Sequence, residues 1–209
     1  MTGRNLKRSL QVLAGSLLGL ALVFLWLAQS TGGPEESEDI RDYFLPSPIP
    51  APDFTLTAQD GARVSSSEFP HRLRVIFFGY TFCPDVCPLT LTHLTEAFRL
   101  MEEDGTRVQV LLVTVDPERD SPQRLGAYLR NFHPSFLGLT GSEEEIRRVA
   151  DGFGAYFARV GDSPDYTVDH TARSFVVDRA GNIVLTFPIT ATPPEMARDL
   201  EMLLEREEQ

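Results

Sequence analysis

The pattern of hydrophobic and polar positions predicts strands that alternate with helices. Two continuous apolar stretches, Arg74–Tyr80 and Val108–Val115, have the composition of strands that are covered on both faces of a sheet. Between these stretches, apolar residues recur at helical spacing, at Leu91, Leu94, Phe98 and Met101. This spacing predicts a helix that packs one face against the core.

Three further helices are predicted from capping signals. Each begins with a Ser or Thr that can cap the first turn, followed by a Pro or by a Glu three residues later. The expected helices run from Ser121 to about Asn131, from Ser142 to about Asp151 and from Thr192 to about Glu205.

Three strands complete the predicted domain. Tyr156–Val160 is expected to be a short strand, and Arg173–Asp178 with Ile183–Phe187 is expected to form a hairpin around the turn at 179–182. The resulting order is a parallel βαβα half followed by an antiparallel hairpin and a helix. This order predicts an α/β fold of the thioredoxin type, with a mixed central sheet and helices on both faces.

The N-terminal segment predicts a membrane anchor. No charged residue occurs from Ser9 to Pro34, and a run of this length can span about 30 Å of hydrocarbon as a helix. Because the basic residues precede it, we expect residues 1–8 to be a cytoplasmic tail and residues 9–30 a single-pass anchor in the inner (cytoplasmic) membrane. A signal peptide that is cleaved near residue 30 is the alternative.

A linker and one domain follow this segment. Residues 31–50 combine glycines, an acidic patch and three prolines, which predicts a linker that is first flexible and then stiff. Residues 51–209 are expected to form the thioredoxin-like domain on the periplasmic or extracytoplasmic side. Thiols in that compartment face an oxidising environment.

The charge of the chain excludes one class of partner. The net charge is −11, and all 30 acidic residues lie beyond the first eight positions, which hold three of the 19 basic residues. A protein that binds nucleic acid through its phosphates needs a basic surface. We therefore expect no nucleic-acid partner.

The candidate chemistry begins with the only two cysteines, Cys83 and Cys87. They follow a predicted buried strand and precede a helix, so the helix N-terminus should favour their thiolate forms. Two residues four apart lie on one face of a helix, where both sulfurs can bind one ion or form a disulfide. Redox dithiols of the thioredoxin kind have two intervening residues, whereas three leave room for a metal ion. Soft thiolates select Cu(I), and an imidazole would complete a trigonal site.

The chain offers four histidines as a third ligand. His71 and His133 lie in predicted loops, and His93 should face away from the cysteines on their helix. His170 lies just before the strand that starts at Arg173, in a loop that packs against the dithiol in thioredoxin-type folds. His170 is therefore a ligand candidate, with an ordinary loop histidine as the alternative.

Phe78–Pro88, together with the loop Asp165–Thr171, resembles the Sco/SenC family, and Val113–Pro122 is close to a further segment of that family. The resemblance covers roughly residues 50–207. It implies a membrane-anchored, thioredoxin-fold copper protein that helps assemble the dinuclear copper centre of cytochrome c oxidase. By this resemblance, the copper ligands are Cys83, Cys87 and His170, and the acidic neighbours of the site are Asp85, Asp116 and Asp169. Turn formation and helix capping are alternative roles for these three aspartates.

The resemblance leaves three activities open. The first is copper delivery coupled to thiol–disulfide chemistry of Cys83 and Cys87, which is binding and handover rather than turnover. Its partners would be the copper-bearing oxidase subunit, an upstream copper donor and a thiol reductant. The second is a thiol–disulfide reductase that acts on cysteines of the oxidase subunit. The third is a peroxidase, although no positioned arginine is evident beside Cys83 in the sequence.

Overall fold

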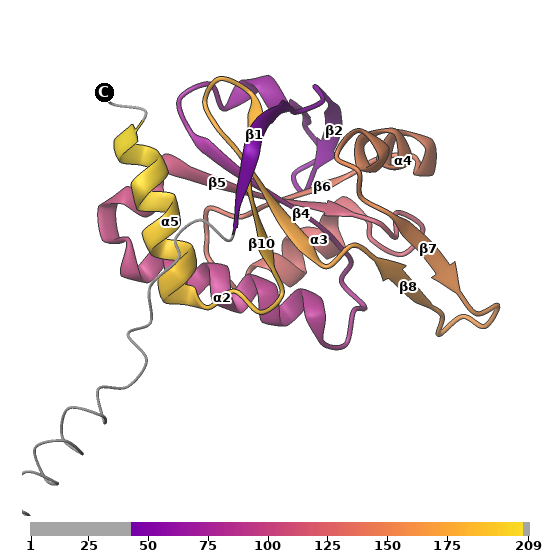
Figure 1. Cartoon of the computed structure of the whole chain (residues 1–209). Coiled ribbons are helices and arrows are strands. Elements are labelled where there is room, and N and C mark those ends of the chain that lie inside the picture. Colours follow the sequence, from indigo (N-terminus) through magenta and orange to yellow (C-terminus); the bar gives the residue numbers. More distant parts are fainter. Residues whose placement is uncertain (1–42, 207–209) are drawn as a thin grey trace, which may run out of the picture. The chain divides into compact units, whose positions relative to one another are not determined.

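The computed structural model describes residues 43–206. Its core is an eight-stranded mixed sheet with the strand order β1-β10-β9-β4-β5-β6-β2-β3 (Figure 1). The strands are β1 (Phe44–Pro50), β2 (Thr55–Ala58), β3 (Arg63–Ser65), β4 (Leu73–Gly79), β5 (Val108–Thr114), β6 (Leu137–Thr140), β9 (Arg173–Val177) and β10 (Asn182–Pro188). A separate two-stranded sheet consists of β7 (Phe157–Val160) and β8 (Thr167–His170).

The centre of the sheet is formed by the two predicted apolar strands. All residues of β4 and β5 are buried, and the two strands pair in parallel from Leu73 with Val108 to Gly79 with Thr114. On its other side, β4 pairs antiparallel with β9. These findings confirm the prediction of a mixed sheet whose central strands are covered on both faces.

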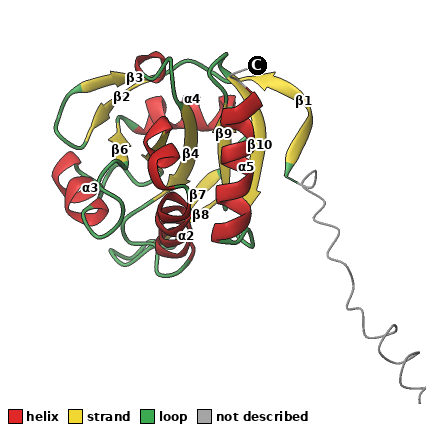
Figure 2. Cartoon of the chain, turned by 90° about the vertical axis from the view of Figure 1, so that its left-hand side faces the viewer, coloured by secondary structure: helices red, strands yellow, loops and turns green. Residues whose placement is uncertain are grey.

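Helices cover both faces of this sheet. They are α2 (Val86–Leu100), α3 (Pro122–Leu129), α4 (Glu143–Gly152) and α5 (Pro193–Arg206), with 3₁₀ turns η1 (Ser66–Glu68) and η2 (Glu102–Arg107). The crossovers that contain α2 and α3 run in the same direction along the sheet, so right-handed connections place both helices on one face. Figure 2 shows α2 and α5 side by side, and the two helices pack against each other. Figure 1 shows α4 on the opposite side of the sheet.

The predicted helix starts are confirmed. Ser121 caps α3, with its side chain accepting a hydrogen bond from the Arg124 amide, and Pro122 is the first helical residue. Ser142 and Glu145 form the expected capping box at the start of α4. The predicted hairpin is also present, as β9 and β10.

The predicted linker at residues 31–50 needs correction at its end, because Phe44–Pro50 forms strand β1 at the edge of the sheet. Prolines are tolerated in an edge strand, because the backbone positions at which they lack an N–H can face solvent instead of a neighbouring strand. Phe44 pairs with Leu185 and Pro50 pairs with Asn182 of β10. Because β1, β10, β9 and β4 are each antiparallel to the next, β1 runs antiparallel to β4, and the register places Phe44 level with Val75 of β4.

The segment that contains His170 also differs from the prediction. It was expected to be a loop, but Thr167–His170 is strand β8, which pairs antiparallel with β7. In the register of this pair, His170 lies opposite Phe157. Burial alternates along β8, with Val168 buried and Asp169 exposed, as is typical of a strand. This alternation over four residues is too short to be recognised in the sequence, which is why the stretch was assigned to a loop.

The predicted N-terminal tail (1–8) and anchor (9–30) lie outside the described residues. Within residues 43–206, no helix has both the length and the apolar character that are needed to cross a membrane.

Candidate metal centre

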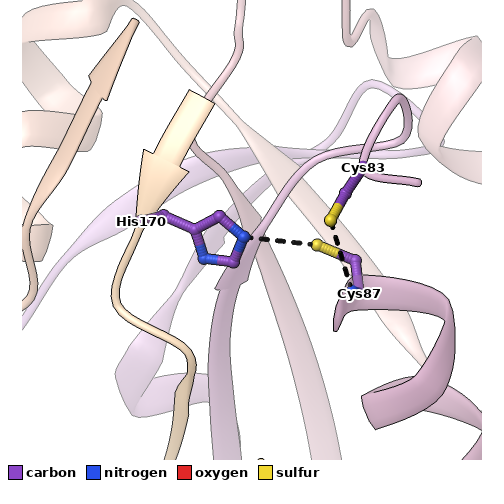
Figure 3. A group of neighbouring side chains, drawn as sticks. All are labelled: Cys83, Cys87 and His170. Atoms are coloured by element: carbon purple, nitrogen blue, oxygen red, sulfur yellow. Dashed lines mark hydrogen bonds between the residues drawn. The ribbon is translucent and has the colours of Figure 1, made fainter. Parts of the chain in front are cut away.

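The two cysteines lie where β4 passes into α2. Cys83 is half-buried in the loop before the helix, and Cys87 is fully buried in the first turn of α2. The backbone amide of Cys87 donates a hydrogen bond to Cys83 Sγ at 3.4 Å (Figure 3). The free N–H groups of a helix N-terminus therefore face the Cys83 sulfur, as the sequence predicted.

His170 reaches the same place from the separate two-stranded sheet. It is the last residue of β8, and its Nε2 lies 3.6 Å from Cys87 Sγ (Figure 3). Its Nδ1 lies 3.2 Å from the carbonyl oxygen of Thr171, which can only accept, so Nδ1 carries the proton. The lone pair of Nε2 then points toward the sulfurs. A backbone acceptor for the second ring nitrogen is typical of metal-binding histidines.

Two aromatic rings hold the imidazole from the side. The rings of Phe77 and Tyr80 meet His170 edge-on, with centroid distances of 6.1 and 5.8 Å. The Tyr80 hydroxyl also accepts a hydrogen bond from the Val168 amide at 3.2 Å, which joins β8 to the start of the cysteine loop. The ring of His170 is thus oriented by residues that closely precede the cysteines in sequence.

The three side chains form a site that suits a soft metal ion. Cys83 Sγ, Cys87 Sγ and a ring nitrogen of His170 all lie within 4.8 Å of one another. Among the described residues, this is the one cluster of three His, Cys, Asp or Glu side chains with that proximity. Two sulfurs and one imidazole nitrogen are donors that Cu(I) prefers, whereas structural zinc requires a fourth ligand. The residues therefore fit a copper ion.

The two thiols differ in acidity. The hydrogen bond from the Cys87 thiol lowers the pKa of Cys83, and the backbone amides of Asp85 and Cys87 act in the same direction, although burial opposes this shift. The same hydrogen bond to Cys83, together with burial, raises the pKa of Cys87. The metal-free reduced site thus holds one thiolate and one thiol, and the expectation of a favoured thiolate is wrong for Cys87 because burial and the hydrogen bond to Cys83 outweigh the helix N-terminus. A metal ion that binds both sulfurs must displace the second proton.

Gly79 provides the space that the buried sulfur occupies. A Cβ atom at this position would lie 2.9 Å from Cys87 Sγ and 2.8 Å from Cε1 of Phe77. The sequence reasoning did not identify Gly79, although a glycine at the end of an apolar strand and directly before a cysteine loop is a usable signal.

The other three histidines lie away from this cluster. His93 Nδ1 lies 3.1 Å from the carbonyl oxygen of Ala191, and His133 packs against the rings of Phe98 and Phe136. His71 is exposed before β4. Each position agrees with the prediction for that residue.

None of the three predicted acidic neighbours belongs to the cluster. Asp85 is exposed at the N-cap of α2, and its side chain makes no capping hydrogen bond. Asp169 is exposed on β8. Asp116 is buried, pairs with Arg119 and accepts a 2.6 Å hydrogen bond from the Tyr166 hydroxyl. Asp116 therefore organises the loop after β5.

A fourth aspartate, Asp120, was missed as a site residue. It is fully buried, and burial raises its pKa. Its carboxylate accepts hydrogen bonds from the Thr81 amide at 3.0 Å, the Thr81 hydroxyl at 2.6 Å and the Thr114 hydroxyl at 2.7 Å. Asp120 thus fixes the backbone two residues before Cys83. Its position in Val113–Pro122, a segment used for the family resemblance, was the available signal.

Comparison with known proteins decides the family. The SCO1/SenC family model matches residues 47–205. The chain belongs to the SCO1/SenC family. A family relative, the SCO2-like protein of Rickettsia felis, is 37% identical over 152 residues, which cover 71% of this chain and 74% of that protein.

Solved structures of SCO1/SenC proteins have the same fold. The structure of Bradyrhizobium japonicum ScoI with copper bound has a TM-score of 0.69 and 40% identity, and the match covers 74% of this chain and 99% of that one. BsSco, described as a member of the Sco family of cytochrome c oxidase assembly proteins with a disulfide switch, has a TM-score of 0.61 at 24% identity, over 75% of this chain and 94% of that one. The predicted thioredoxin-like mixed sheet is therefore the fold of this chain.

Proposed function

We propose that this protein binds one copper ion through Cys83, Cys87 and His170 and delivers it to the dinuclear copper centre of cytochrome c oxidase during assembly. The observation that carries the proposal is the convergence of two sulfurs and one imidazole nitrogen within 4.8 Å of one another. The copper bound to Bradyrhizobium japonicum ScoI and the oxidase-assembly role given for BsSco support the same reading.

The different exposure of the two cysteines favours transfer of copper to a partner protein. Cys83 is half-buried, so one sulfur ligand is accessible to a partner, whereas Cys87 is fully buried. An accepting protein can therefore approach the ion from the Cys83 side and replace its ligands one at a time. The partners of this cycle are an upstream copper donor and the copper-bearing oxidase subunit.

Loading is coupled to the oxidation state of the thiols. A disulfide between Cys83 and Cys87 would remove both sulfur ligands, so a thiol reductant must act before copper binds. The proposed location adds to this need. A single-pass anchor at residues 9–30, with the domain on the periplasmic or extracytoplasmic side of the inner membrane, places the thiols in an oxidising compartment.

Copper titration of the reduced domain tests the ligand set. We expect one copper per monomer, and we expect His170→Ala and Cys83→Ala to weaken binding by more than about 100-fold, since even outer contacts of metal ligands contribute about 10–100-fold. His71→Ala is the matched control, because that histidine is exposed outside the cluster. Unchanged affinity in His170→Ala would contradict the proposed site.

A transfer assay tests the delivery step. The copper-loaded protein is mixed with the copper-free oxidase domain that carries the dinuclear centre, and the visible spectrum of that centre is followed. Copper should appear there with the loaded wild-type protein and not with a Cys83→Ala variant. If the protein binds copper tightly but does not transfer it, the result would contradict delivery and would support a role in copper storage.

A thiol–disulfide reductase is the second candidate, and the acidity of the thiols favours it. Cys83 is half-buried and has a lowered pKa, which are the properties of an attacking thiolate. Reduction of a disulfide peptide from the oxidase subunit should then survive His170→Ala and be lost in Cys83→Ser. Loss of oxidase maturation in both variants would favour copper delivery.

A further inference from the structure

The strand that carries His170 is not part of the main sheet. The strands β7 and β8 pair only with each other in the described fold, and Figure 1 shows them as a hairpin that extends away from the main sheet. Cys83 and Cys87, in contrast, follow directly from the central strand β4. The spacing between imidazole and sulfurs therefore depends on the contacts that join this hairpin to the cysteine loop.

Arg119, in the loop after β5, lies at the junction of these two parts. The centre of its guanidinium is 3.6 Å from the ring centroid of Tyr166, just before β8, and 4.5 Å from that of Phe82, next to Cys83. Its Nη1 also donates to the carbonyl oxygen of Pro164 at 3.5 Å. One planar cation thus contacts an aromatic ring from each part.

The guanidinium is itself fixed in place. Its Nε donates to Oδ2 of Asp116, and Oδ1 of the same carboxylate accepts the 2.6 Å hydrogen bond from the Tyr166 hydroxyl. The Arg119 side chain is only 16% exposed, and Asp116 is buried. Within residues 43–206, Nη2 of Arg119 is buried and has no hydrogen-bond acceptor, in keeping with its position among aromatic faces.

We infer that Arg119 is a positioning residue that holds the β7–β8 hairpin against the cysteine loop and so keeps His170 within bonding reach of the metal ion. This inference rests on the proposed copper site. Arg119 acts through His170 and does not contact the metal. Without the guanidinium, Tyr166 and Phe82 lose their common partner, and the site keeps its two sulfurs while its nitrogen ligand becomes displaced.

A double-mutant cycle in copper affinity tests this inference, because a positioning role and a general structural role give different results. Arg119→Ala in the wild-type background should weaken copper binding by about 10–100-fold, the range for residues that orient metal ligands. In the His170→Ala background, the same change should weaken binding by less than about threefold, since the ligand that it positions is already absent. Equal losses in both backgrounds, or no loss in either, would overturn the inference.

Spectroscopy of the Cu(II) form provides an independent readout. The wild-type protein should have nitrogen hyperfine coupling from one imidazole, and Arg119→Ala should lose or weaken this coupling while it keeps the thiolate-to-copper charge-transfer band. Arg119→Lys retains the charge beside Asp116 but lacks the planar face, so it should give an intermediate spectrum and should fold if the alanine variant does not. A lysine variant with wild-type affinity and spectrum would contradict the stacking role.

Arg147→Ala is the matched control. Arg147 also stacks on a ring of the hairpin, with its guanidinium 4.5 Å from the centroid of Phe157, but it forms an ion pair with Glu143 of α4. This variant should bind copper as the wild type does.

Two outcomes of the spectroscopy separate the proposed copper site from the inference about Arg119. If the wild-type protein shows no nitrogen hyperfine coupling from an imidazole, the proposed copper site fails. If it shows coupling that Arg119→Ala leaves intact, only the inference about Arg119 fails.

Discussion

Gly79→Ala is a sharp perturbation of the proposed site, because one added methyl group would meet the buried sulfur. The new Cβ would lie 2.9 Å from Cys87 Sγ, 2.8 Å from Cε1 of Phe77 and 3.2 Å from Cδ1 of Leu112. Ordinary contacts between such atoms are about 3.5–4.0 Å, so the sulfur or the strand must move by roughly 0.6–1 Å. Gly79 pairs regularly with Thr114 in the sheet, so its backbone is that of an ordinary strand and can accept an alanine.

The expected magnitude follows from the overpacking. A methyl group forced into a filled core typically costs about 1–3 kcal/mol, so the free energy of unfolding should fall by that amount. Metal–ligand distances are held to within about 0.2 Å, which is well below the required movement of the sulfur. Copper affinity should therefore fall at least about tenfold, or about 1.4 kcal/mol.

Urea unfolding and competition with a coloured Cu(I) chelator measure these two effects. Gly126→Ala is the control, because its Cβ would find its nearest neighbour at 3.6 Å, an ordinary contact, within helix α3. That change should stabilise the protein by about 0.5–1 kcal/mol and leave copper affinity unaltered. If Gly79→Ala has wild-type stability and wild-type affinity, the close contact between this position and the sulfur is wrong.

Three further changes test other parts of the structure. Asp120→Ala leaves the buried hydroxyl of Thr114 and the partly buried donors of Thr81 without an acceptor and should lower the free energy of unfolding by at least about 2 kcal/mol, with a smaller loss in Asp120→Asn; an unchanged urea midpoint would refute this role. In the reduced, metal-free protein at about pH 6, below the ordinary thiol pKa, iodoacetamide should modify Cys83, whose pKa is lowered, and spare Cys87, whose pKa is raised; equal labelling by mass spectrometry would contradict the assignment. Ser142→Ala removes the capping box of α4 and should cost about 1 kcal/mol in thermal unfolding without any effect on copper binding, whereas a large loss of affinity would mean that α4 supports the site.

The sequence was sufficient for the parts of the fold that have strong local signals. Uninterrupted apolar runs identified β4 and β5, and Ser–Pro and Ser–Glu pairs identified the starts of α3 and α4. The spacing of Cys83 and Cys87 at a strand–helix junction placed both sulfurs at a helix N-terminus, and the structure confirms that position. The position of His170 just before the predicted strand at Arg173 made it the third ligand candidate, the family resemblance pointed to the same residue, and the structure brings it to the same cluster.

The remaining features depend on neighbours that are distant in sequence. Phe44–Pro50 has the prolines of a linker, and it becomes a strand only because β10 offers a free edge. Gly79 is important for the site because a Cβ there would meet Cys87 Sγ. Asp120 is important because it accepts a hydrogen bond from the Thr81 hydroxyl. Arg119 has no distinguishing signal in the sequence, because the rings that it contacts, Tyr166 and Phe82, lie 47 and 37 residues away. Composition and periodicity contain no information about such contacts between residues that are distant in sequence.

The position of β1 at the edge of the sheet has a consequence for how the domain meets other molecules. β1 pairs only with β10 in the described sheet, and three strand spacings, about 14 Å in total, separate it from β4. The β1 prolines at positions 46, 48 and 50 have no N–H to donate, so this edge is a poor template for a strand of a second protein molecule, which protects the sheet against edge-to-edge aggregation.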